Sequence, residues 1–185
     1  MTLLPFFEWL AATPWSVALI ESQYAYAIVE SVHVWTLCLF VGLAAMLDLR
    51  LMGVFLPQVP VSQVARRLLP WTVAGFVVMV ASGLLLFYAI PVRTYQNIFF
   101  RTKLLLLVLA GINVFVFHNG IYRSVHSWDL APRPPRSARL AGAASLVLWS
   151  LIIVAGRMIA YNWFDCDTIE GELVRTLSGC GPLGN

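Results

Sequence analysis

The side chains of this sequence that could do chemistry lie inside apolar runs. Glu30 and His33 stand three residues apart in YAYAIVESVHVWTLCLF, residues 24–40, so an α-helix places them on one face. His118 and Arg157 lie in two other apolar runs. An ionisable group costs roughly 2.5–3.5 kcal/mol in a bilayer core on insertion scales, and it usually faces the interior of a helix bundle. We therefore expect each of these four side chains to have a partner or a function.

The two histidines predict a haem site. A neutral imidazole is the commonest protein ligand for transition metals and also ligates haem iron, and His33 and His118 fall on different predicted helices. Glu30 would orient His33 by a hydrogen bond, as partners of metal-ligating histidines do. Helical rise places His33 about 14 Å and His118 about 22 Å below the outer end of the first span. A shared iron therefore requires tilt or offset of about 8 Å. The alternative is that both histidines only bond neighbouring helices.

Other charged residues lie near the ends of the apolar runs. Glu30 and Arg157 fall at similar depth, which predicts an interhelical ion pair that fixes helix register or serves a function. Arg101 and Lys103 begin an apolar run. Their side chains are expected to extend to lipid headgroups, or to bind an anion such as a lipid phosphate or a haem propionate. The motif LDLR, residues 47–50, predicts an interfacial charge pair between its Asp and Arg.

The elements that position these residues follow from the composition. The chain has 185 residues, of which 60% are hydrophobic and 11% are charged, against about 25% charged residues in a soluble domain. Its mean hydropathy is +0.81. The prediction is an all-α integral membrane protein, a four-helix bundle with N-terminal interfacial helices in residues 1–22. Expected spans are 24–47, 69–90, 103–121 and 138–161, within a domain of residues 1–163. Thr13 and Pro14 predict a helix start.

Orientation follows from the basic residues. The loops after the first and third spans hold seven arginines, whereas the other side holds four basic residues. The positive-inside rule then places both termini outside the cytoplasm. The tail of residues 164–185 carries Cys166 and Cys180 on that outer side, where disulfides persist, so a bridge is favoured over two free thiols. The net charge of +3 comes with dispersed arginines, which does not indicate a nucleic-acid partner.

Three stretches resemble an uncharacterised family of small bacterial four-helix inner-membrane proteins, a domain of unknown function. They are ESVHVWTLCLFVGLAAMLDLRLMG, LLPWTVAGFVVMVASGLLLF and FRTKLLLLVLAGINVFVFH, at residues 30–53, 68–87 and 100–118. The resemblance implies a multi-pass protein of the bacterial cytoplasmic membrane, and the positive-inside count then makes both termini periplasmic. It extends to Glu30, His33, Arg101, Lys103 and His118. More loosely, the helix-borne histidines are similar to those of cytochrome b561-type and copper-resistance D-type proteins.

Three functions are compatible with these features. The first is a haem-b subunit that passes electrons between quinone and an external redox partner, with His33 and His118 as axial ligands and Arg101 or Lys103 near a propionate. The second is a non-redox accessory or assembly subunit of a larger membrane complex. The third is copper handling through His33, Met46 and Met52. Besides the lipid bilayer, other membrane or periplasmic subunits are the expected partners, because the acidic tail after Trp163 lies outside the resemblance.

Overall fold

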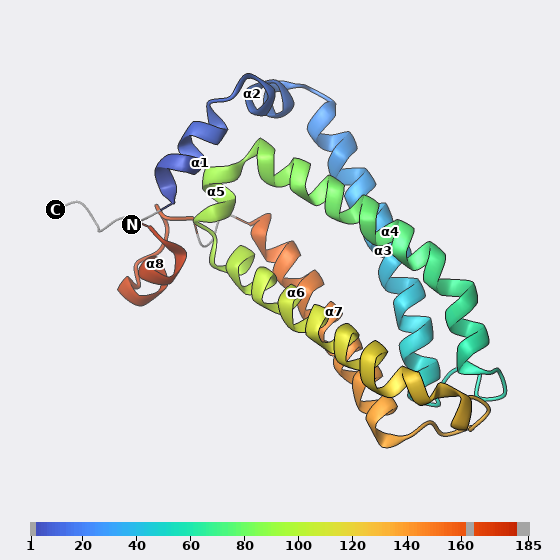
Figure 1. The fold of residues 1–185 in the computed structure, drawn as a ribbon. Coiled ribbons are helices and arrows are strands. Elements are labelled where there is room, and N and C mark those ends of the chain that lie inside the picture. Colours follow the sequence, from blue (N-terminus) through green and yellow to red (C-terminus); the bar gives the residue numbers. More distant parts are fainter. Residues whose placement is uncertain (1–2, 162–164, 181–185) are drawn as a thin grey trace. The chain divides into compact units, whose positions relative to one another are not determined.

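The computed structural model describes residues 3–161 and 165–180, and over these residues its regular elements are all helices (Figure 1). Four of them are long and apolar enough to cross a membrane. They are α3 (Ala25–Leu51), α4 (Val61–Ala89), α6 (Ile98–Val116) and α7 (Arg136–Ile159). The predicted all-α class with four spans is confirmed, and the chain is a multi-pass membrane protein. The predicted boundary between domain and tail, at residues 163 and 164, lies outside the described residues.

Helix α4 begins eight residues before the predicted start of the second span. Proline usually ends or kinks a helix, because it lacks a backbone N–H and clashes with the turn before it. The structure instead carries Pro70 inside α4, as membrane helices often do. The segment with Arg66 and Arg67 is therefore helical. The prediction that these two arginines lie in the loop after the first span was wrong.

Short helices precede and connect the spans. They are α1 (Leu4–Ala11), α2 (Pro14–Glu21), α5 (Pro91–Tyr95), the π-helical η1 (Phe117–Ile121), the 3-10 helix η2 (Tyr122–Ser127) and α8 (Glu172–Ser178). Helix α2 begins at Pro14 after Thr13 in extended conformation, which confirms the predicted start. Proline suits this position because the first helical N–H has no partner in any case.

Internal contacts divide the chain into two compact units. The first unit contains Met1–His33, Val80–Leu105 and Ile153–Asn185, and the second contains Val34–Met79 and Leu106–Ile152. Each of the four long helices therefore contributes one part to each unit. His33, Arg101 and Lys103 belong to the first unit, whereas His118 belongs to the second.

Aromatic rings connect the helices of the first unit. The ring of Phe7 lies 4.5 Å from Tyr95 and 5.6 Å from Phe87, and Phe87 stacks on Phe100 at 5.3 Å. Helix α1 consequently lies beside α5 (Figure 1). The Thr13 hydroxyl is 2.6 Å from that of Tyr88. These contacts hold the two N-terminal helices against α4, α5 and α6.

Two apolar clusters form the core of the second unit. One contains Leu51, Val61, Phe117, Val125, Trp128 and Ala138, and the other contains Phe40, Met79, Ala110, Trp149 and Ile152. The ring of Phe40 packs edge-to-face on Trp149 at 4.6 Å. A Cβ on Gly75 would lie 3.5 Å from Phe40, so this small residue lies where α3 and α4 pack closely.

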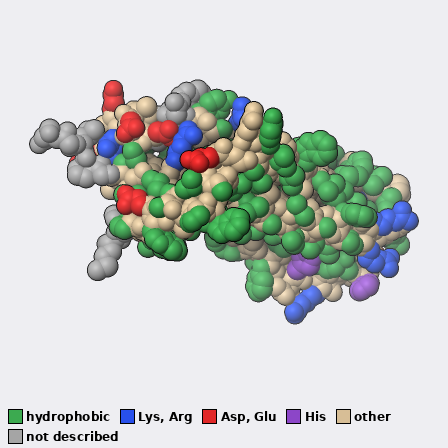
Figure 2. All heavy atoms as spheres, turned by 90° about the horizontal axis from the view of Figure 1, so that it is seen from above, with side chains coloured by type: hydrophobic (Ala, Val, Ile, Leu, Met, Phe, Trp, Pro, Cys, Tyr) green, Lys and Arg blue, Asp and Glu red, His purple; other side chains and the backbone are tan. Residues whose placement is uncertain are grey.

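Apolar side chains cover much of the molecular face seen in Figure 2. Trp35 is 80% exposed on α3, and Phe115 is 68% exposed on α6. An aqueous protein surface rarely carries contiguous apolar patches of this kind. Their presence on spanning helices indicates a lipid bilayer environment.

Candidate functional site

His33 packs against two small residues of α4. Its Nδ1 lies 3.1 Å from the hydroxyl oxygen of Ser82. A Cβ on Gly83 would lie 3.1 Å from Cε1 of the imidazole, so the ring contacts the α4 backbone closely. His33, Ser82 and Gly83 all belong to the first unit. Ser82 thus holds the imidazole ring in a fixed orientation, and the hydrogen bond between His33 and Glu30 stays a prediction.

The predicted ion pair between Glu30 and Arg157 does not form. Glu30 is exposed, and the guanidinium carbon of Arg157 lies 5.2 Å from the ring centre of Tyr161. Arg157 is in the last turn of α7, from which it reaches the aromatic ring that follows the helix. Arg93 does form an ion pair, with the carboxylate of Asp165 at 3.3 Å.

His118 lies on η1, the π-helical segment that follows α6. Its side chain is exposed, and Nδ1 is 3.3 Å from the carbonyl oxygen of Val114 one turn earlier. The ring centre lies 5.6 Å from that of Tyr122. No group of three His, Cys, Asp or Glu side chains with metal-binding geometry occurs among the described residues. An iron site shared by His33 and His118 stays a prediction.

Two glycines near the histidines in sequence face open space. Gly42 follows His33 on α3, and Gly111 precedes His118 on α6. Nothing lies within 4 Å of the position that a Cβ would take on either glycine. Both glycines therefore lie on the exposed surface of their helices.

Arg101 connects the start of α6 to the tail. Its guanidinium donates to the carbonyl oxygens of Tyr95 and Leu177, at 3.3 and 2.8 Å, and lies over the Tyr95 ring. Lys103, by contrast, extends along α7, with Nζ 3.4 Å from where a Cβ on Gly156 would be. Both side chains thus contact protein, and Arg101 binds the tail backbone.

The tail forms a closed loop. Cys166 and Cys180 form a disulfide, with Cα atoms 5.6 Å apart. Inside the loop, Arg175 donates to the carbonyl oxygens of Cys166 and Ile169. Gly179 ends α8 at φ +73°, a left-handed conformation that suits glycine. Two contacts attach the tail to the rest of the first unit: the ion pair of Arg93 with Asp165, and the hydrogen bond from Arg101 to Leu177.

The prediction of a charge pair between Asp48 and Arg50 is wrong. Residues two apart on a helix point in different directions. Asp48 is buried, and its Oδ2 has no hydrogen-bond partner among the residues that the structure describes. Arg50 is fully buried and donates from Nε to the carbonyl oxygen of Val59 at 2.7 Å. Its Nη2 lies 3.4 Å from the carbonyl oxygen of Ala131.

Asp129 fixes the start of α4. Its carboxylate accepts hydrogen bonds from the backbone N–H of Ser62, at 2.8 Å, and from the Ser62 hydroxyl, at 2.6 Å. Burial alone would raise the pKa of Asp129, but these two hydrogen bonds and the charges of His126 and Arg50 together lower it. Local sequence patterns do not predict this contact, because 67 residues separate its partners.

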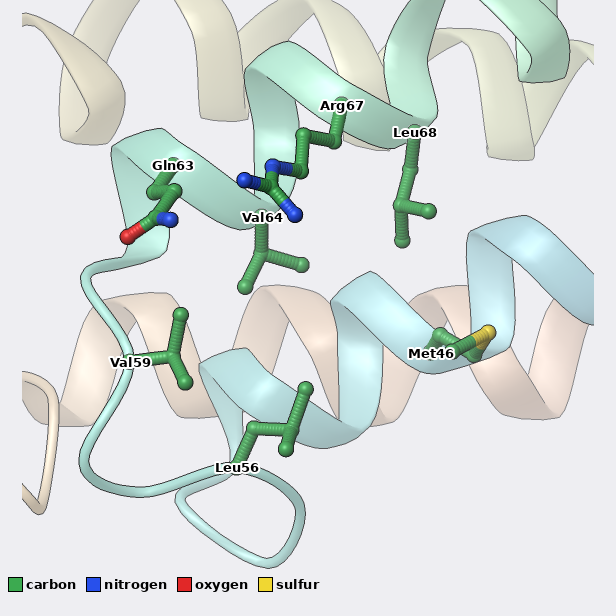
Figure 3. Close-up of a pocket in the computed structure, with 7 residues that line it drawn as sticks. All are labelled: Met46, Leu56, Val59, Gln63, Val64, Arg67 and Leu68. Carbon is green, nitrogen blue, oxygen red and sulfur yellow. The ribbon is translucent and has the colours of Figure 1, made fainter.

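A pocket of about 240 Å³ lies in the second unit (Figure 3). Val64, Arg67 and Leu68 extend into it from α4, and Met46 lies opposite on α3. Leu56, in the connecting loop, contributes from a backbone with φ +49°, which is uncommon outside glycine. The sequence did not predict this pocket, since its walls come from three separate segments.

Comparison with known proteins assigns the chain to a family. No curated protein and no solved structure matches the chain. The model of a family of unknown function, DUF6644, matches residues 6–162. The matched region contains all four spans and ends before the disulfide-closed tail. The chain therefore belongs to the DUF6644 family.

Proposed function

We propose that this protein is a non-redox accessory subunit of a larger complex in the bacterial cytoplasmic membrane. The single observation that carries the proposal is the way its polar side chains are used. His33 and Arg50 each bond a residue of the chain itself. Such bonds hold helix ends and loops together, which is what a scaffold requires of intramembrane polar groups.

The tail is the proposed contact with an external partner. It lies beyond the part of the chain that matches the family, and it carries Asp165, Asp167, Glu170 and Glu172. Attachment through Arg93 and Arg101 presents this acidic loop as a rigid body. A rigid contact surface loses little conformational entropy on association. The arginine distribution supports an orientation in which this loop is periplasmic.

A second candidate function is electron transfer through haem b, between quinone and an external redox partner. One observation favours it: Ser82 orients His33. His33 fits the role of an axial ligand, whereas His118 bonds its own helix. When bound, haem would supply a one-electron carrier, and this chain would supply its ligands and a water-poor surrounding.

One preparation distinguishes the two functions. The chain is purified from its native membrane in mild detergent, and its native size and its reduced-minus-oxidised spectrum are measured. The accessory function predicts a larger assembly without a haem signal, and His33→Ala lowers the yield of that assembly by weakening α3–α4 packing. A Cys166→Ser/Cys180→Ser variant releases the partner, whereas Cys38→Ser, at an exposed free cysteine, does not.

Two results would contradict the accessory function. If the chain purified from its native membrane has the size of a monomer, it is not part of a larger assembly. A Soret band that disappears in both His33→Ala and His118→Ala would establish haem binding in its place.

A further inference from the structure

We propose that the pocket between α3 and α4 binds the headgroup and the upper acyl chain of an anionic phospholipid. Its walls are largely apolar, with Met46, Leu56 and Leu68 among the residues that line it. Arg67 and Gln63 add a cation and an amide from α4. Apolar walls beside a few polar donors suit an amphipathic ligand.

The charge of the second unit favours an anion. This unit contains seven arginines and two carboxylates, Asp48 and Asp129. Asp129 is already engaged by Ser62, and Asp48 is buried and does not line the pocket. Arg67 is exposed and has no hydrogen bond or ion pair with any residue that the structure describes. A phosphate group would supply the missing counter-charge.

The position of Arg67 fits a lipid better than a soluble anion. Arg67 directly precedes the long apolar run of α4 that begins at Leu68. Met46 and Leu56 are 37% and 40% exposed, so their side of the pocket is open for an acyl chain. Basic pockets between spans on the cytoplasmic side bind anionic headgroups in this way.

Buried polar groups hold the pocket open. Arg50 donates to the carbonyl oxygen of Val59, which lines the pocket. The N–H of Val59 donates to the carbonyl oxygen of Leu56. Asp129 fixes the next residues through Ser62. The loop that carries Leu56 is thus attached at both ends before any ligand arrives, which lowers the entropic cost of binding.

Native mass spectrometry of the full chain in detergent tests the proposal, with phosphatidylglycerol and phosphatidylcholine as probes. We expect preferential binding of phosphatidylglycerol. Arg67→Gln should weaken it about fivefold, the effect of about one interfacial cation. Arg66→Gln removes the neighbouring exposed charge, which does not line the pocket, and should leave binding nearly unchanged.

A second matched pair tests the pocket itself. Leu68→Trp fills it and should also displace phosphatidylglycerol, whereas Leu69→Trp, at an exposed residue outside the pocket, should not. Equal binding of the two lipids, or equal losses in Arg66→Gln and Arg67→Gln, would overturn the proposal. Displacement of the lipid by inorganic phosphate alone would indicate a soluble anion, and displacement by a quinone would indicate a different occupant.

Discussion

Arg50 and Asp129 show how single charged residues organise the second unit. Arg50 is fully buried at the end of α3 and donates to backbone carbonyls of two different loops. Asp129 accepts two hydrogen bonds from Ser62 at the start of α4. Hydrogen bonds to charged groups contribute about 1.5–3 kcal/mol each. These two residues therefore connect loops that the sequence separates widely.

The Asp129 contact makes stability depend on pH at this residue. Its pKa is lowered in the folded protein, so the stabilisation is fully present above the ordinary aspartate pKa of about 3.9. It is lost as pH falls through the lower, folded-state value. Asp129→Asn should cost about 1 kcal/mol near neutral pH, as loss of a helix cap does. The difference from wild type should shrink in acid.

Thermal unfolding in detergent, followed from pH 7 downward, measures that difference. Asp167→Asn changes an exposed carboxylate of the tail and serves as the control. An Asp129→Asn variant whose deficit stays constant over the whole pH range would contradict this role.

At the scale of elements, glycine determines how closely the spans pack. A Cβ on Gly142 of α7 would lie 2.8 Å from the Asp48 carbonyl oxygen of α3, which is too close for two atoms that cannot move apart. On Gly111 of α6, by contrast, nothing lies within 4 Å of the position that a Cβ would take. Both glycines are inside helices, so their helix propensities are alike and only their surroundings differ.

Alanine at these two glycines should therefore have opposite effects. Gly142→Ala should lose about 1–3 kcal/mol by overpacking, whereas Gly111→Ala should gain up to about 1 kcal/mol from reduced backbone freedom in the unfolded chain. Unfolding of each purified variant in a denaturing detergent measures the difference. Equal effects of the two substitutions would show that α3 and α7 do not pack closely at Gly142.

For the whole molecule, the tail is an addition to a family domain. The family match ends at residue 162, and the disulfide-closed loop follows it. A bridge across a loop of this length restricts the unfolded chain by about 3 kcal/mol. The loop should thus open independently of the spans once the disulfide is reduced.

Reduction of the Cys166–Cys180 disulfide should raise the rate of tryptic cleavage after Arg175 about a hundredfold. This factor corresponds to a fall of about 3 kcal/mol in the free energy of opening the loop. Arg175 is half-buried and donates to two carbonyls of the loop, so it resists the protease while the loop is closed. Cleavage after the exposed Arg136, in the second unit, should not change. Peptide mapping by mass spectrometry checks both sites, and an equal rise at Arg136 would mean that reduction unfolds the whole chain.

The sequence by itself determined the four spans and the start of α2 at Pro14, because hydropathy over about 20 residues and proline geometry are local properties. Only the tertiary structure decided the partners of Arg50 and Arg157. A partner depends on the rotation and depth of each helix, and a rotation of one residue moves a side chain by about 100° around the axis. The pocket at Arg67 was likewise beyond the sequence, since three segments must come together to form its walls.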